Sequence, residues 1–430
     1  MKLPLGDQSL EVELPKSMKL LTYSKPDEAK SLSEDEIPKA FKEKILHPIG
    51  RNVLTSDINS STTIVIVVDD ISRPTPTPVL VAPLIDYLEE IGVTKDQITF
   101  IFGLGVHREM TQEEAEIKLG QEIAQQYHWE NHDSEQNLEY LGKTNRGTPI
   151  NINKTYYDAD FKICIGLIEP HLWAGYSGGQ KGIVPGIAGV DTIYHHHQLV
   201  RHNIVDVGNL EDNPFRDDLE EMVDIIGLDL LINVILTPNK RIHDLVIGEV
   251  HTAFEQGVEI SKNFSELFVS GKSDVIISSP HPLGIDFRQS SKAAFNTKNA
   301  LRKGGYMIVV SDCPEGRGNV SAADDPPSRW LIRLLAKILP SKLLMWVIRK
   351  QGYGIEDAAG TFRMFKFIAD YNYLFVSPNM SDKDREILFV ADHFKTVDEA
   401  LDYVASQQNG DTFSVYVFPQ GGSTYPVVAT

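Results

Sequence analysis

Seven short runs of apolar, largely β-branched residues constrain the fold of this chain more than any other feature. Each run is continuous rather than alternating, which is typical of strands buried on both faces, as in parallel sheets. Gly, Pro or acidic residues follow each run closely, and helical patterns lie between the early runs, at 78–92 and at 111–128. Thr111 and Glu114 form a capping-box pair that opens the second helical pattern. The alternation predicts an α/β fold with mostly parallel sheets, its strands at 63–68, 98–102, 161–168, 231–236, 274–279, 306–310 and 373–377.

The length of 430 residues suits two domains. A second run of strands and helices begins after the polar stretch GKSD at 271–274. We therefore expect an N-terminal α/β domain over 1–272 and a C-terminal α/β domain over 273–430. An active-site cleft is expected between the two domains.

Composition restricts the partners of the chain. The net charge of −19 disfavours binding to nucleic acid or to anionic membranes, so any anionic ligand must be held by local cationic residues. Cys164 and Cys313 are too few for a disulfide framework, which fits a reducing cytoplasm, and the N-terminus has no apolar signal-peptide core. The apolar segment 329–350 is interrupted by charges and by Pro340, so it cannot span a bilayer. We interpret it as two amphipathic helices packed within the protein, with a role at a membrane surface as the alternative.

Polar side chains gather where the predicted strands end. In an open α/β sheet, ligands bind beyond the carboxyl ends of the strands. The first predicted strand is followed by Asp70 and Arg73, the second by His107, and the third by His171 and Lys181. The segment that follows residue 279 contains Arg288, Gln289 and Lys292. Each histidine could instead be an ordinary surface residue. Because His107 and His171 follow neighbouring predicted strands, a catalytic role is as well supported as a position on the surface.

The glycine-rich stretch around Lys181 has two interpretations. Ser177, Gly178 and Gly179 precede the lysine directly, and glycines let a backbone approach a ligand closely. A lysine beside them can meet a phosphate or act as a nucleophile. The same glycines could also serve turns alone.

Three successive histidines follow at 195–197. On a helix that begins near Asp191, Ile193 and His197 fall on one face, but His196 also lies near Ile193, so periodicity does not choose between them. A packed helix-face histidine and a metal ligand both remain open.

Together, DDISRP (69–74), GLGVHREMTQEE (103–114), EPHLWAGYSGGQKGIVPG (169–186) and RQSSK (288–292) resemble the lactate racemase family. Members of that family are nickel-pincer-dependent 2-hydroxyacid racemases and epimerases. The resemblance implies a pyridinium-3,5-bisthiocarboxylic acid mononucleotide that carries nickel and is covalently attached to Lys181. It implies His197 as the protein's nickel ligand, and cofactor contacts from Asp70, Ser177, Gly178 and Gly179. Enzymes that synthesise the cofactor would be the partners of such a protein.

The same resemblance assigns the catalytic roles. His107 and His171 would be the two proton-transferring bases, Arg73 would stabilise the substrate's developing charge, and Gln289 and Lys292 would bind substrate. Arg288 stands where the lactate enzymes carry a tyrosine. A further guanidinium favours a substrate larger or more anionic than lactate, a malate-like dicarboxylate or a sugar acid such as gluconate. Lactate itself is the alternative, with Arg288 facing solvent.

Two other functions use some of these residues. A pyridoxal-phosphate enzyme with Lys181 as the Schiff-base lysine would explain the lysine and the glycines, but not the paired histidines. A non-enzymatic cofactor carrier would need no pair of bases. The hydrogen on C2 of a 2-hydroxyacid is only weakly acidic, so its removal as a proton is difficult. Inversion by hydride transfer, with one base for each face, explains the lysine, the glycines and the paired histidines together.

Overall fold

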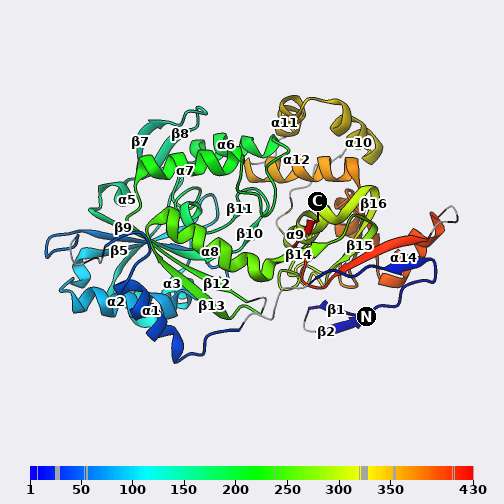
Figure 1. Ribbon diagram of the computed structural model, residues 1–430. Helices are drawn as coiled ribbons and strands as arrows, with labels where there is room; N and C mark the ends of the chain where they lie inside the picture. Colours follow the sequence, from blue (N-terminus) through cyan, green and yellow to red (C-terminus); the bar gives the residue numbers. More distant parts are fainter. Residues whose placement is uncertain are drawn as a thin grey trace. The chain divides into compact units, whose positions relative to one another are not determined.

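The computed structural model describes residues 1–430 except 7, 25–29, 53, 55–56, 238, 319, 321–327, 352–354, 409, 411 and 430. The chain forms two compact units (Figure 1). One comprises Glu28–Leu199 and Asn209–Asn263, and the other comprises Met1–Asp27, Val200–Gly208 and Phe264–Thr430.

The unit built mainly from the N-terminal half contains a six-stranded sheet in the order β13-β12-β9-β4-β5-β6. All neighbouring strands are parallel except β13, which pairs antiparallel with β12. The strands are β4 (Ile64–Asp69), β5 (Ile98–Gly103), β6 (His128–Asn131), β9 (Phe161–Ile168), β12 (Leu230–Leu236) and β13 (Ile242–Gly248). Two small antiparallel pairs accompany it, β7 (Leu138–Lys143) with β8 (Pro149–Asn153) and β10 (Pro170–His171) with β11 (Gly175–Tyr176).

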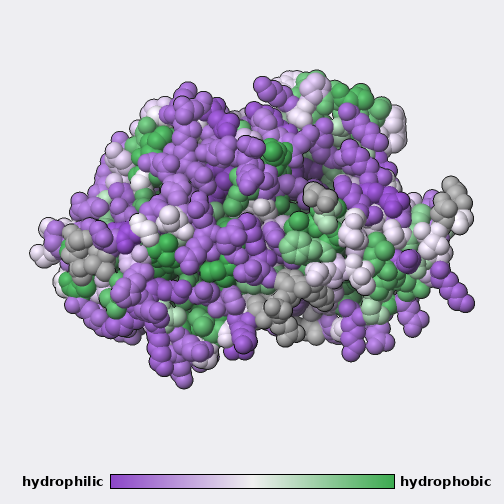
Figure 2. Space-filling view, viewed as in Figure 1, coloured by the Kyte–Doolittle hydropathy of each residue, from purple (hydrophilic) through white to green (hydrophobic). Residues whose placement is uncertain are grey.

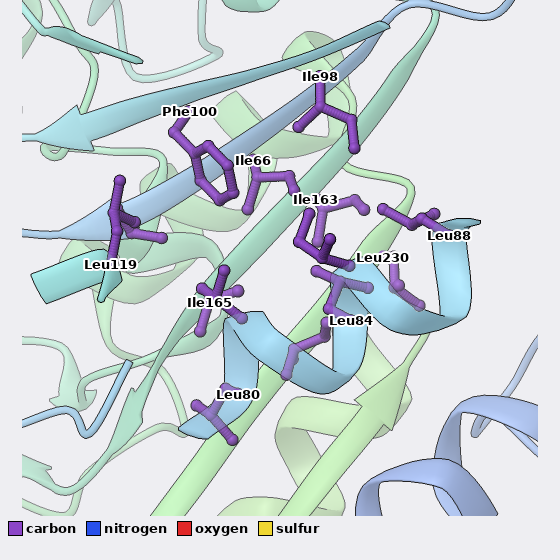
Figure 3. Packing of buried hydrophobic residues seen from close by; sticks show 14 of the residues in the cluster. Ile66, Leu80, Leu84, Leu88, Ile98, Phe100, Leu119, Ile163, Ile165 and Leu230 are labelled. Carbon is purple, nitrogen blue, oxygen red and sulfur yellow. The ribbon is translucent and has the colours of Figure 1, made fainter. Parts of the chain in front are cut away.

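Apolar side chains spaced at helical periodicity fix the helices on this sheet. In α2 (Pro78–Glu90), Leu80, Leu84 and Leu88 recur every fourth residue and pack against Ile66 and Ile163 of the sheet (Figure 3). Burial of each leucine contributes about 2 kcal/mol. The other helices of this part of the chain are α1 (Glu36–Leu46), α3 (Gln112–Leu119), α4 (Gln121–Gln126), α5 (Lys154–Asp158), α6 (Val190–His197), α7 (Pro214–Ile226) and α8 (Val250–Ser265).

The second unit has its own six-stranded sheet, in the order β18-β17-β16-β15-β19-β3, and all its pairs are parallel. Its strands are β3 (Met18–Leu20), β15 (Ser273–Ser278), β16 (Leu301–Val310), β17 (Asn372–Val376), β18 (Asp392–Phe394) and β19 (Phe413–Phe418). Smaller pairs are β1 (Lys2–Leu5) with β2 (Gln8–Glu11) and β14 (Glu266–Val269) with β20 (Tyr425–Val428). The helices are α9 (Phe287–Thr297), α10 (Arg329–Ile338), α11 (Ser341–Lys350), α12 (Ile355–Asp370), α13 (Asp382–Ile387) and α14 (Val397–Ser406).

The mostly parallel α/β architecture is as predicted, and the seven predicted strands are present with shifts at their ends. The helical pattern at 111–128 is two helices instead of one, because Gly120 has φ +91°, a left-handed conformation that ends α3. The unit boundaries differ from the expected division at 272/273. Since β3 pairs with β19, the N-terminal residues pack with the C-terminal part of the chain. The cleft expected between domains stays a prediction. Within the described residues, no helix is long and apolar enough to cross a membrane.

Candidate active site

Three adjacent strands carry the main candidates at their carboxyl ends. β9, β4 and β5 are neighbours in the sheet, and the segments that follow them hold Asp70, His107, His171 and Lys181. Because the three strands are parallel, these segments emerge from the same edge. All four residues, and Arg73 and His197 with them, belong to one unit.

Asp70 and His107 form a close pair. His107 Nδ1 lies 2.6 Å from Asp70 Oδ2, and the carboxylate is largely buried. The other carboxylate oxygen accepts hydrogen bonds from the backbone and side chain of Ser72. Burial alone would raise the pKa of Asp70, but the hydrogen bonds from His107 and Ser72 and nearby positive charge outweigh it and lower the pKa to about 2. In the structure the Asp70 side chain contacts His107 and Ser72, and its predicted contact with the cofactor stays a prediction.

A buried lysine organises the loop that carries Asp70 and Arg73. Lys118 of α3 is 3% exposed, and its Nζ lies 2.5 Å from Asp69 Oδ1. The same ammonium donates hydrogen bonds to the carbonyl oxygens of Arg73 and Thr75, at 3.1 and 3.4 Å. Burial raises the pKa of Asp69, and Lys118 opposes that shift. Lys118 therefore positions the backbone of Arg73 through these hydrogen bonds. The sequence analysis did not identify this role.

The segment with Lys181 is tied to the segment with His107. Lys181 lies in a short 3-10 turn, Gly179–Gly182, and the Gly105 N–H donates to the carbonyl oxygen of Gly186 at 2.8 Å. At Gly103, a Cβ would lie 3.3 Å from the Cα of Gly186, so the two segments touch through their backbones. Lys181 and His107 thus come from loops that pack directly on one another.

The glycines before Lys181 have a demonstrable packing role. Gly178 has φ +78°, and a Cβ there would lie 2.7 Å from Asn233 Oδ1. Gly179 donates its N–H to that same oxygen at 2.7 Å, and the Ser177 hydroxyl donates to the carbonyl oxygen of Leu167 at 2.9 Å. These polar groups are therefore used within the protein. Cofactor contacts from Ser177, Gly178 and Gly179 stay predictions.

His171 is oriented by backbone amides. It ends β10, and its Nδ1 accepts hydrogen bonds from the N–H groups of Trp173 and Ala174, both at 3.2 Å. In that arrangement a neutral imidazole carries its proton on Nε2. The Trp173 ring meets His171 edge-on with centroids 6.1 Å apart, and it meets His197 in the same way at 5.2 Å. Trp173, which the sequence did not single out, therefore contacts both histidines.

His197 and His196 are both buried on α6, and each is oriented through Nδ1. His197 Nδ1 donates to the carbonyl oxygen of Ile193 at 2.7 Å, which leaves the lone pair on Nε2, as a metal ligand requires. His196 Nδ1 lies 3.1 Å from Asp218, and in the described part of the chain its Nε2 has no hydrogen-bond partner. Burial lowers the pKa of His196, Asp218 opposes the shift, and the positive charge of Lys181 reinforces it. The tautomers fit either histidine as a ligand, so the choice of His197 stays a prediction.

The predicted substrate residues belong to the other unit, on the first turns of α9. The Asp286 side chain caps this helix by accepting from the Gln289 N–H at 2.7 Å. Arg288 is exposed, whereas Gln289 and Lys292 are partly buried. Arg288 and Lys292 lie one helical turn apart and so share a face.

Among the described residues, no three His, Cys, Asp or Glu side chains are grouped as a metal site. The tautomer of His197 is compatible with a role as a metal ligand.

Comparison with known proteins finds similarity to lactate racemases. Residues 5–207 match the lactate racemase N-terminal domain. The chain is 27% identical to a lactate racemase of Thermoanaerobacterium thermosaccharolyticum over 82% of this chain and 88% of that protein. It is 28% identical to a lactate racemase of Lactiplantibacillus plantarum, over 72% and 78% respectively.

Solved structures agree on the fold. The structure of the lactate racemase apoprotein from Thermoanaerobacterium thermosaccharolyticum superposes with a TM-score of 0.83 at 24% identity, over 99% of each chain. A protein from Thermotoga maritima superposes with a TM-score of 0.66 at 17% identity, over 94% of this chain and all of that one. The chain is thus similar to lactate racemases along most of its length, and residues 5–207 match the N-terminal domain of that family.

Proposed function

We propose that this protein is an isomerase that inverts C2 of a 2-hydroxyacid, using a nickel-pincer nucleotide attached to Lys181. The observation that carries the proposal is the arrangement of the two histidines. His107 and His171 are each held through Nδ1, and they emerge with Lys181 from the same edge of one sheet. The names of the relatives support the reaction class.

The residues present fit this cofactor. Lys181 would carry the covalent link, and His197 would present Nε2 to nickel, with its Nδ1–H already engaged by Ile193. Planar coordination with sulfur and nitrogen donors suits Ni(II). When bound, the cofactor supplies reversible hydride acceptance from C2. Asp70 is better suited to orienting His107 than to touching the cofactor, since one of its oxygens already meets the imidazole.

The two enantiomers present their hydroxyl groups to opposite sides, so each needs its own base. With Nδ1–H directed at Asp70, His107 would take the hydroxyl proton on Nε2, and the carboxylate stabilises the imidazolium that forms. His171 would serve the other face once its Nδ1, which accepts from the Trp173 and Ala174 N–H groups, is released. The Arg73 guanidinium would pair with the substrate carboxylate or the developing oxyanion.

Arg288, Gln289 and Lys292 would select the substrate. The Arg288 guanidinium would suit a second carboxylate or a chain of hydroxyls. We propose a malate-like dicarboxylate first and a sugar acid such as gluconate second, in place of lactate. The Arg288→Tyr variant should lower kcat/KM for the dicarboxylate by about tenfold or more and spare activity on lactate. Lactate as the best substrate of the unmodified protein would overturn this choice.

The test is activity of the cofactor-loaded protein against a panel of D- and L-2-hydroxyacids, together with its intact mass. Co-expression with the cofactor-synthesis enzymes should produce an adduct that Lys181→Ala abolishes and that a surface control, Lys143→Ala, retains. An adduct on the Lys181→Ala protein would overturn the attachment. Absence of racemisation of every acid by loaded protein would overturn the reaction.

We further propose that the protein acts in a reducing compartment, the cytoplasm. Cys164 and Cys313 are both free thiols, and each is buried.

A further inference from the structure

The segment 329–350 combines three properties that are rarely found together on a surface that faces only water. It forms two consecutive helices, α10 and α11, joined at Pro340. It contains six Lys or Arg residues and no Asp or Glu, in a chain whose net charge is −19. It also contains two of the four tryptophans of the chain, Trp330 and Trp346.

One face of this helix pair is fully used within its own unit. Ile332 and Ala336 of α10, and Leu344, Met345 and Ile348 of α11, are each about 2% exposed or less. The pair packs on α12, and Lys366 of α12 donates to the carbonyl oxygen of Ala336 at 2.6 Å. This confirms the prediction of two amphipathic helices packed on the protein.

The opposite face is apolar as well, and that was not expected. Trp330, Leu334 and Ile338 recur every fourth residue along α10 and are 67%, 44% and 63% exposed. On α11, Leu343 and Trp346 are 44% and 55% exposed. Figure 2 shows green, hydrophobic surface in the region of the α10–α11 pair, next to hydrophilic residues. An exposed apolar patch of this kind is typical of a surface that binds a partner or a membrane.

The basic residues of the pair divide into two groups. Arg329 is used internally, in an ion pair with Asp392 at 2.5 Å, and Arg333 donates to the carbonyl oxygen of Tyr371. The remaining four cations are exposed beside the apolar face, at Lys337, Lys342, Arg349 and Lys350. Lys350 Nζ lies 5.8 Å from the centre of the Trp346 ring. The exposed face thus alternates indole and aliphatic groups with positive charges.

We propose that the α10–α11 face docks peripherally on an anionic lipid surface. Tryptophan is suited to the boundary between headgroups and acyl chains, because its ring is apolar and its N–H is polar. Lysine and arginine reach outward from the same depth to lipid phosphates. The charge supports lipid over a second copy of this chain, since apposed copies of a face with four cations and no acidic residue of its own would repel each other. The helices lie on the surface and do not cross it.

Vesicle binding by the full-length protein tests the proposal. We expect co-sedimentation with vesicles of phosphatidylcholine mixed with phosphatidylglycerol, weak binding to phosphatidylcholine alone, and a blue shift of tryptophan emission on binding. The Lys337→Glu, Lys342→Glu double variant should lower the partition coefficient by about tenfold or more. A matched pair on exposed strand and loop positions elsewhere, Lys16→Glu with Lys143→Glu, should leave partitioning within about twofold of wild type.

Trp330→Ser with Trp346→Ser should abolish the blue shift, and a far-UV circular dichroism melt checks that the variant is folded. The charge variant keeps the test valid if the tryptophan variant unfolds. Equal binding to neutral and anionic vesicles, or none to either, would overturn the proposal. So would a wild-type dimer in solution that becomes a monomer in the tryptophan variant without vesicle binding, because the face would then be a contact between copies.

Discussion

The two candidate bases are oriented by opposite kinds of chemistry. His107 gives its Nδ1 to a buried carboxylate, Asp70, whereas His171 accepts two backbone N–H groups on its Nδ1. His107 can gain a proton on Nε2 and keep its contact, since an imidazolium still donates from Nδ1 to Asp70. Protonated His171 would carry hydrogen on both nitrogens, so the turn of residues 171–174 would have to release it. His107 can therefore change its charge without losing its hydrogen bond, whereas His171 stays neutral unless the turn of residues 171–174 moves.

Removing the carboxylate beside His107 should have the largest effect. Asp70→Asn keeps the size of the side chain but removes its charge, and an amide N–H turned toward Nδ1 would favour the wrong tautomer of His107, so kcat should fall by about a thousandfold. Racemisation by cofactor-loaded protein, started from each enantiomer, measures this. Ser72→Ala, which removes only one hydrogen bond to Asp70, serves as the control and should cost less than about tenfold. Near-normal turnover of Asp70→Asn would mean that the carboxylate does not orient a base.

The stability of the loop that carries Asp70 and Arg73 should depend on charge, unlike the stability of the turn of residues 171–174. Lys118→Met leaves the partly buried Asp69 without its cation, which should cost about 3 kcal/mol in the free energy of unfolding. Adding Asp69→Asn should restore part of that loss, because the uncompensated charge is then gone. Urea unfolding of the two single variants and the double variant measures the coupling. Simple additivity would show that the Lys118–Asp69 contact is energetically neutral.

The stability of the loop that carries Asp70 should depend on pH in strong acid, unlike the stability of the turn that holds His171. The folded-state pKa of Asp70 is about 2, against about 3.9 for an unfolded aspartate. A lowered pKa contributes stability that is present above about pH 4 and is lost as the pH falls toward 2, an effect of about 2 to 3 kcal/mol. The stability advantage of wild type over Asp70→Asn should therefore shrink across that interval in acid unfolding experiments. A constant advantage would place the origin of the difference elsewhere.

Trp173 should give the smallest of the four effects. The Trp173→Leu change keeps the backbone N–H that reaches His171 but removes the ring that contacts both His171 and His197. The lost edge contacts correspond to about a tenfold reduction in kcat. Phe295→Leu, an aromatic change in the other unit, controls for general loss of ring packing. A loss in kcat equal to that of the control would leave Trp173 with packing alone.

The sequence by itself determined the α/β class, the seven main strands and the strand ends at which candidates collect. These follow from local patterns, because a strand buried on both faces must be a continuous apolar run. The same local rules found α2 from its leucines and the start of α3 from Thr111 and Glu114. The helices α10 and α11 were also predictable, but only the exposed fractions of Trp330 and Trp346 revealed a second apolar face.

Tertiary structure alone decided which side chains meet. Lys118 reads in sequence as a solvated helix lysine, and its burial against Asp69 depends on how α3 packs on the sheet. Asp70 reads as one more acid at a strand end, and its bond to His107 exists because β4 and β5 are neighbours across a parallel sheet. The glycines at 178 and 179 suggested a ligand, whereas Asn233, more than fifty positions later, supplies their contact. Pairings between residues distant in sequence arise from strand order and helix packing, which a local pattern does not encode.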